Sequence, residues 1–107
     1  MNEPPVDAVF SALSDATRRS VIRLLSEGDA NATEIAGRLP VSRQAVTKHL
    51  LALSEAGLVS SEREGREKRY HLTPAPFQDV VSWMAEVGAG WDGRLQALQR
   101  YVQGEDG

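Results

Sequence analysis

Apolar residues in the middle of the chain show helical spacing from Asn31 onward. Asn31 and Glu34 have the spacing of a capping box, in which each side chain bonds to the backbone N–H of the other residue. The residues that follow predict a helix to about residue 39, where Pro40 stops it because proline lacks an N–H and disfavours helix in the residue before it. The apolar residues of its inner face are Ile35, Ala36 and Leu39.

A second helix with an apolar face follows at once. Ser42 is placed to cap its N-terminus, and Gly57 is placed to end it. The residues that recur at i, i+4 and i+7 as its buried stripe are Val46, Leu50 and Leu53. Only Pro40 and Val41 then separate the two helices, so the sequence predicts a tight helix-turn-helix.

Two short strands are predicted after this unit, at residues 58–63 and 68–72, around a charged turn at 64–67. The residues expected to face inward are Val59, Tyr70 and Leu72. Helix, turn, helix and hairpin in this order predict a winged helix, in which the hairpin is the wing.

Helices are also predicted on both sides of this central unit. Residues 6–13 and 15–26 form two helices before it, and Asp15 caps the second. Arg18 and Arg19 fall in the first turn of that helix, an unfavourable place for cations, so we expect them to have partners in a structural role, with carboxylate and phosphate partners both open. After two prolines, an apolar stripe runs through about residues 75–102. The expected fold is mainly α with a small hairpin, in the order α-α-α-α-β-β-α.

The apolar stripe of the last helix is too long for the core of one small subunit. Part of it, together with residues 6–13, is therefore expected to meet a second copy across a two-fold axis. Glycines at 88, 90 and 93 predict a bend or break in its middle. The predicted dimerisation residues are Val9, Phe10, Leu13, Met84, Trp91, Leu95 and Leu98. Core packing, a pocket wall and the dimer interface are all open for Trp83 and Trp91.

Length and composition indicate one globular domain spanning residues 1–107. The chain has 107 residues, of which 41% are hydrophobic. No apolar run approaches the roughly 20 residues that span a bilayer, and no signal segment opens the chain, so we expect a cytoplasmic protein without a membrane partner. Because the chain contains no cysteine, disulfides and thiolate metal sites are excluded as mechanisms.

The net charge of −3 argues mildly against a nucleic-acid partner, but the charge is unevenly distributed. Residues 31–72 carry seven basic and five acidic side chains, a net charge of +2, whereas both flanking regions are acidic. The positive excess coincides with the helix-turn-helix and the hairpin, the two elements that would touch DNA.

The predicted second helix of the helix-turn-helix leaves one polar face unpacked. Ser42 and the helix N-terminus, with Arg43 nearby, are expected to anchor a phosphate. Gln44 and Thr47 are the candidates for base contacts, and Lys48 can reach guanine or phosphate. The expected contacts of the hairpin with the flanking DNA backbone are Arg63, Arg66 and Lys68.

At these residues the chain resembles the ArsR-type family of bacterial winged-helix repressors. Three blocks carry the resemblance, namely ALSDATRRSVIRLL at 12–25, SRQAVTKHLLALSEAGLV at 42–59 and REKRYHLT at 66–73. The C-terminal stretch with Trp83, Trp91 and GRLQALQRYV resembles one branch of that family. The resemblance implies a homodimeric repressor that binds an inverted-repeat operator in double-stranded DNA, with autoregulation and release by a signal.

The resemblance also bears on metals. Metal sensors of that family use cysteines in the first helix of the helix-turn-helix, or carboxylate and histidine sets on the last helix. Here the first of these helices has no cysteine and the last has no histidine, so we expect neither a metal site nor another cofactor. His49 is expected to be structural, and a set made only of Asp79, Glu86 and Asp92 would bind soft or borderline metals poorly.

Three further points stay open or are excluded at this stage. The chain has no cysteine nucleophile, no glycine-rich phosphate loop of the expected pattern and no pair of acidic residues next to a histidine in the sequence, so no catalytic residue is expected. A winged-helix protein-interaction module without DNA binding is the alternative, because the chain is acidic overall and Leu51 is apolar on the exposed flank of the second helix. No residue identifies an effector, and a small apolar ligand, a partner protein and control by protein concentration alone are all compatible with the sequence.

Overall fold

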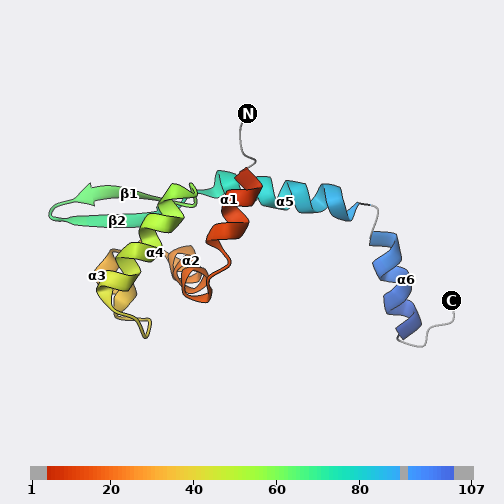
Figure 1. The fold of residues 1–107 in the computed structure, drawn as a ribbon, viewed down its shortest axis with the longest axis horizontal. Helices are drawn as coiled ribbons and strands as arrows, with labels where there is room; N and C mark the ends of the chain where they lie inside the picture. Colours follow the sequence, from red (N-terminus) through yellow and green to blue (C-terminus); the bar gives the residue numbers. More distant parts are fainter. Residues whose placement is uncertain (1–4, 90–91, 103–107) are drawn as a thin grey trace.

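The computed structural model describes residues 5–89 and 92–102 (Figure 1). Within these residues four helices precede a two-stranded hairpin and two helices follow it. The elements are α1 (Pro5–Ala12), α2 (Ala16–Glu27), α3 (Ala32–Ala36), α4 (Arg43–Glu55), β1 (Val59–Glu64), β2 (Glu67–Leu72), α5 (Pro74–Gly88) and α6 (Asp92–Val102). The predicted fold class, mainly α with a small hairpin, is confirmed. The single last helix expected over 75–102 is instead two helices, since α5 ends at Gly88 and α6 begins at Asp92.

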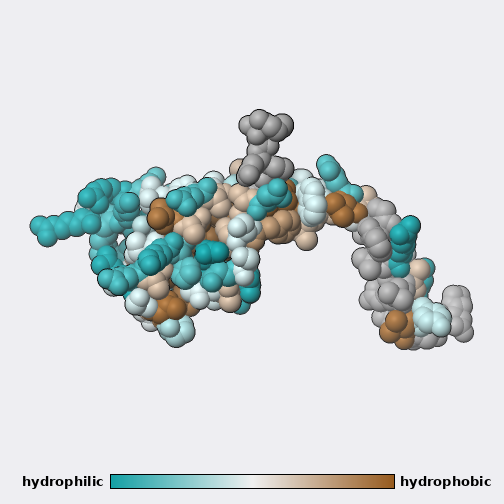
Figure 2. Space-filling model, in the orientation of Figure 1, coloured by the Kyte–Doolittle hydropathy of each residue, from teal (hydrophilic) through white to brown (hydrophobic). Residues whose placement is uncertain are grey.

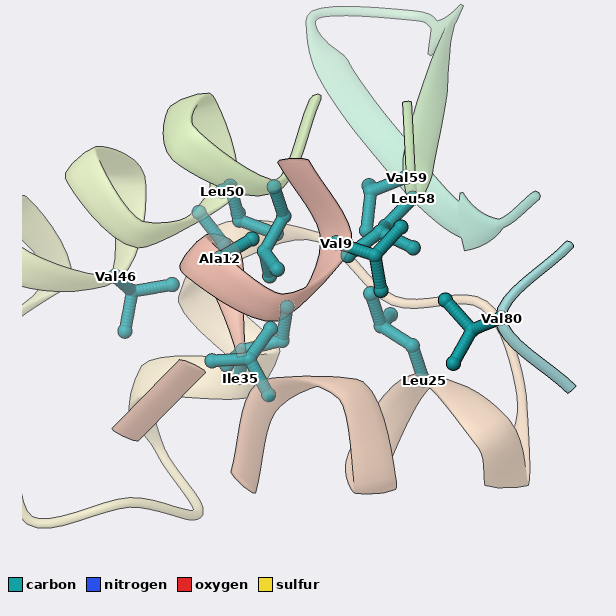
Figure 3. Close-up of a cluster of buried hydrophobic side chains, with 12 residues drawn as sticks. Val9, Ala12, Leu25, Ile35, Val46, Leu50, Leu58, Val59 and Val80 are labelled. Atoms are coloured by element: carbon teal, nitrogen blue, oxygen red, sulfur yellow. The ribbon is translucent and has the colours of Figure 1, made fainter. Parts of the chain in front are cut away.

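The core lies where α1, α2, α3, α4, β1 and α5 converge, and Figure 3 shows its side chains pointing toward one another from these elements. The residues with the largest side chains that are fully buried are Ile35, Leu50, Leu53, Leu58, Val9, Val21 and Val46. The predicted buried stripe of α4 is therefore confirmed. No polar or charged residue is buried among the described residues, so burial of apolar surface supplies the main stabilisation.

Helix α3 is shorter than predicted, because it ends at Ala36 and not at about residue 39. The predicted capping box is present, with Asn31 and Glu34 bonded reciprocally at its N-terminus. At the other end the Arg38 N–H bonds to the Ile35 carbonyl at 3.0 Å, an i−3 bond that tightens the chain into a turn before Pro40. The prediction that only Pro40 and Val41 separate the helices was therefore wrong, and residues 37–42 join them.

Helix α4 begins and ends as its sequence predicts. The Ser42 hydroxyl accepts a hydrogen bond from the Ala45 N–H at 3.1 Å, which caps the N-terminus. At the C-terminus Gly57 has a φ of +79°, and the Leu58 N–H bonds to the Leu53 carbonyl at 2.9 Å. This is a Schellman ending, in which the glycine takes the left-handed conformation that other residues resist. It brings Leu58 directly from the helix into the core.

Strands β1 and β2 pair antiparallel, with Val59 opposite Leu72 at the base and Glu64 opposite Glu67 at the tip. Gly65, with a φ of +65°, and Arg66 form the two-residue turn, and glycine at the first position suits a type II′ hairpin. The residues predicted to face inward behave so, since Val59 is buried and Tyr70 and Leu72 pack against the core.

The ends of α1 and α2 are joined by arginine side chains. Arg18 Nε donates to the Ala12 carbonyl at 2.5 Å, and Arg19 Nη1 donates to the Leu13 carbonyl at 2.6 Å. The structural role expected for these two arginines is thus present, and their side chains donate to backbone carbonyls at the end of α1. The cations lie at the C-terminus of α1, where they are favourable.

Helix α5 crosses α1 and extends away from the helix-turn-helix, and α6 lies beyond it (Figure 1). No helix within the described residues is long and apolar enough to cross a membrane.

Candidate nucleic-acid interface

The outer face of α4 is polar and open. Arg43, Gln44, Thr47 and Lys48 are all exposed, and their spacing places them on one side of the helix. Thr47 donates its hydroxyl proton to the Arg43 carbonyl at 3.0 Å, so its methyl group and the two acceptor lone pairs of the hydroxyl oxygen are left for an outside partner. Ser42 is exposed at the N-terminus, where its hydroxyl already caps the helix.

The hairpin, which we call the wing and define as residues 59–72, places cations beside this face. Arg63 and Lys68 are directly opposite each other in the register of β1 and β2, and Arg66 lies in the turn. Like charges directly opposite each other in a sheet repel, so this pair costs stability unless an anion lies between or beside them.

A polar cleft joins the wing to the helix-turn-helix. The residues lining it are Asn31, Ala32, Thr33, Arg43, Thr47, Arg63, Arg66, Glu67, Lys68 and Tyr70. It therefore brings together five of the eight predicted DNA-contacting residues. The other three, Ser42, Gln44 and Lys48, are exposed on or beside α4 outside this lining. Figure 2 shows hydrophilic surface over the wing and the neighbouring helices.

The seven basic residues of the helix-turn-helix and the wing, within residues 31–72, fall into two groups. Arg38 pairs with Glu27 at 3.2 Å, and Arg69 donates to the Asp29 carbonyl at 2.8 Å, so these arginines are engaged within the protein. Among the described residues, five of the six cations of α4 and the wing have neither an ion pair nor a side-chain hydrogen bond, and Arg69 is the exception. These unpaired cations are Arg43, Lys48, Arg63, Arg66 and Lys68. A polyanion is the class of ligand that such a surface fits.

Two of the three acidic residues in the wing are engaged at the same time. Glu67 accepts a hydrogen bond from Asn31 Nδ2 at 2.6 Å, and Glu64 lies 3.7 Å from Arg69 Nε. Asn31 and Arg69 were not among the predicted site residues. Asn31 was recognised only as a helix cap, and no sequence pattern indicated that Arg69 would turn toward Asp29, forty positions away.

His49 on α4 is half-buried and directed at the N-terminus of α2. Its Nδ1 lies 3.8 Å from Asp15 Oδ2. The Arg18 N–H that Asp15 accepts, at 3.0 Å, and the charge of the nearby His49 together hold the pKa of Asp15 below its ordinary value. This contact gives His49 a structural partner. Within the part of the chain that the structure describes, no three His, Asp or Glu residues are grouped closely enough to hold a metal ion.

A second surface, formed by α1 and α5, is apolar. Phe10 and Trp83 meet edge to face with ring centroids 5.7 Å apart, yet remain 42% and 44% exposed. Further along α5, Met84 is 54% and Val87 51% exposed. We call these four residues the apolar patch. Figure 2 shows hydrophobic surface over this middle part of the molecule.

The other predicted dimerisation residues lie differently. Val9 has no exposed surface, because its side chain is inside the subunit core, so it was wrongly included as a contact residue. Leu13 is half-buried at the edge of that core. Trp91 and the side chains of Leu95 and Leu98 lie outside the described residues.

Known proteins share this arrangement. Residues 13–62 match the family model described as a helix-turn-helix domain. The transcriptional repressor SdpR of Bacillus subtilis (strain 168) is 38% identical over 76 residues, which cover 71% of this chain and 84% of that repressor.

Two solved structures extend the comparison. An ArsR-like transcriptional regulator from Rhodococcus sp. RHA1 has 43% sequence identity and a TM-score of 0.74, covering 91% of this chain and 92% of that one. The homodimeric winged helix-turn-helix DNA-binding domain of Mb0332 from Mycobacterium bovis, described as a possible ArsR-family regulator, has 28% identity and a TM-score of 0.63, covering 87% of this chain and 83% of that one. The chain has a helix-turn-helix and a wing, and its similarity to these proteins extends over most of its length. The protein therefore belongs to the ArsR-type family of winged helix-turn-helix transcriptional regulators.

Proposed function

We propose that this regulator is a homodimeric repressor that binds an inverted-repeat operator and occludes the promoter. The observation that carries the proposal is the cleft in which Arg43 and Thr47 of α4 meet Arg63, Arg66 and Lys68 of the wing. The cations there have no partner among the described residues, and they flank a helix whose outer face is free. Such a helix fits the major groove, about 12 Å wide, while the wing cations reach the flanking phosphates.

Each part of the surface has its own role in this proposal. Gln44 and Thr47 contact base edges, because glutamine can bond adenine bidentately and the threonine methyl can contact a thymine methyl. Ser42, Arg43 and the α4 N-terminus hold a phosphate, and Lys48 reaches guanine or phosphate. The wing residues Arg63, Arg66 and Lys68 bind backbone and therefore add affinity without reading sequence.

Dimerisation is proposed through the apolar patch. Phe10, Trp83, Met84 and Val87 expose apolar side chains on adjacent helices, and a second copy covering them would remove this surface from water. A two-fold dimer with its two copies of α4 roughly 34 Å apart, one turn of B-DNA, would let both half-sites meet the same side chains. Two half-sites compensate for the few phosphate contacts that one subunit makes.

The family and SdpR, which is named a repressor, support repression over activation. We further propose that the protein acts in the cytoplasm, controls its own promoter, and has no catalytic role. Release by an effector would require that the effector bind the DNA-free conformation better, by about 5.5 kcal/mol to reverse a 1:99 balance.

The test is binding of the purified protein to its own upstream DNA and to random duplex of equal length, titrated across salt. We expect preference for the upstream fragment, two chains per site, and affinity that falls as salt rises. A folded dimer that bound neither duplex at low salt would contradict the proposal. It would favour the protein-interaction alternative, to which Leu51, 60% exposed on α4, would then contribute.

A further inference from the structure

The wing needs contacts with the helix-turn-helix to keep a fixed orientation. In Figure 1 it extends beyond the helical body, and residues 60–68 are all exposed. An isolated two-stranded hairpin is only marginally stable in water. Cations at its tip can contact phosphates productively only if the hairpin keeps a fixed angle to α4.

The first attachment is through the backbone. Ala30, in the loop before α3, pairs with Tyr70 of β2 as an isolated antiparallel bridge. The Ala30 N–H donates to the Tyr70 carbonyl at 3.2 Å, and the Tyr70 N–H donates to the Ala30 carbonyl at 2.8 Å. This pair fixes the middle of β2, and the three residues of β2 nearest the turn, 67–69, lie beyond it.

Arg69 attaches the outer part of the wing. Its Nη2 donates to the Asp29 carbonyl at 2.8 Å, and its Nη1 lies 3.6 Å from Glu34 on α3. Its Nε lies 3.7 Å from Glu64, at the end of β1. One guanidinium therefore joins the loop before α3, α3 itself and both strands of the wing.

Asn31 attaches the other side of the tip. Its Oδ1 accepts from the Glu34 N–H at 2.7 Å and caps α3, while its Nδ2 donates to Glu67 at 2.6 Å. The Oδ1 atom of the amide therefore caps α3, and only the Nδ2 atom contacts the wing.

These contacts also engage the two acids that flank the turn. Glu64 and Glu67 would repel phosphates, but Arg69 lies beside the first and Asn31 binds the second. Arg66 between them has no such partner among the described residues and stays available.

We infer that Asn31 and Arg69 are positioning residues, which together form a clasp that holds the wing at the angle from which Arg66 meets DNA. The inference rests on the proposed function for its purpose. Neither residue is assigned a DNA contact of its own, and both act through the wing.

The experiment removes the contacts of the clasp and measures how much Arg66 then contributes to DNA-binding affinity. The clasp variant is Asn31→Ser with Arg69→Gln, since serine keeps the cap of α3 but lacks the amide donor. Asn31→Ser alone, which changes no charge, is the milder second variant. The matched control is Arg38→Gln, which removes an arginine paired with Glu27 at 3.2 Å but away from the wing. Arg66→Ala is introduced into the wild type and into each of these backgrounds.

We expect Arg66→Ala to weaken DNA binding about ten-fold in the wild type and the Arg38→Gln control, the scale of one charge-assisted hydrogen bond. In the clasp variant the same change should cost less than about three-fold, because the two sites are coupled. An equal loss in every background would overturn the inference, since Arg66 would then be positioned without the clasp.

Amide hydrogen exchange of the free protein gives a readout that does not require DNA. Breaking the clasp should speed exchange in residues 61–70 and leave the α4 amides unchanged. If the wild type bound no DNA, the proposed function would be wrong. Hydrogen exchange alone would then test whether Asn31 and Arg69 hold the wing in place. Unchanged exchange in the wing would overturn the inference.

Discussion

The rings of Phe10 and Trp83 meet edge to face, 5.7 Å between centroids and 74° between planes, and join α1 to α5. Edge-to-face packing is favourable, yet about two-fifths of each side chain remains exposed. The contact therefore holds the two rings in a fixed arrangement and leaves an apolar surface exposed to solvent. Met84 and Val87 extend that surface along α5.

A charge on this surface should separate the subunits without unfolding them. Met84→Asp places a carboxylate where the proposed interface would exclude water, which is costly for an unpaired charge. We expect a monomer by sedimentation velocity, with unchanged circular dichroism. Ser82→Asp is the control, because it lies two residues away on α5 and so points about 200° from Met84. Dissociation by both variants, or by neither, would argue against the apolar patch as the interface.

The roles proposed for α4 and the wing predict different losses. Gln44→Ala should cost about 1–3 kcal/mol on the operator and little on random DNA, because it removes a base contact. Arg66→Ala should weaken both duplexes alike and flatten the dependence of affinity on salt. Fluorescence anisotropy with the two duplexes across salt measures both effects.

Arg23→Ala serves as the control for charge, since Arg23 is an exposed arginine on α2 outside the cleft. Loss of specific binding alone in Arg66→Ala, or equal losses on both duplexes in Gln44→Ala, would reverse the assigned roles.

Local chemistry made the helix-turn-helix predictable. Asn31 and Ser42 cap helices through residues only three positions away, and the inward stripe of α4 follows from its period. The short α3 was missed because its end depends on a tightened turn at Arg38 rather than on Pro40 alone.

Contacts between distant residues were beyond sequence reasoning. Arg69 and Asp29 are forty positions apart, and no periodicity links them. Val9 and Phe10 are neighbours on an apolar helix, but the sequence does not distinguish the side that faces the subunit core from the side that faces outward. The structure separates them, with Val9 fully buried and Phe10 42% exposed.

Two glycines should respond oppositely to alanine. Gly57 has a φ of +79°, so Gly57→Ala should destabilise the protein by about 1–2 kcal/mol through backbone strain. Its new Cβ would lie 3.6 Å from Pro76 Cγ, an ordinary contact, which leaves strain as the cause. Gly37 has a φ of −70°, so Gly37→Ala should stabilise by about 0.4–1 kcal/mol by restricting the unfolded chain. Urea unfolding measures both, and shifts of the same sign would contradict the argument.

The surroundings of the Asp15 carboxylate predict that the folded protein loses stability in acid. Its carboxylate accepts the Arg18 N–H at 3.0 Å and lies 3.8 Å from His49 Nδ1, and these neighbours lower its pKa from the ordinary value of 3.8. The folded state therefore binds the Asp15 proton less readily than the unfolded state does. The resulting stabilisation is complete above the ordinary value and is lost as the pH falls through the lower pKa of the folded state.

Asp15→Asn isolates this contribution, because asparagine also caps helices but does not titrate. Thermal unfolding between about pH 6 and pH 2 should show the wild type more stable than the variant at the upper end. The difference should shrink as the pH drops below the ordinary value of Asp15 and vanish once the carboxyl is protonated in both states. A difference that stayed constant over the whole range would show that Asp15 stabilises α2 by its shape and hydrogen bonding and not by its charge.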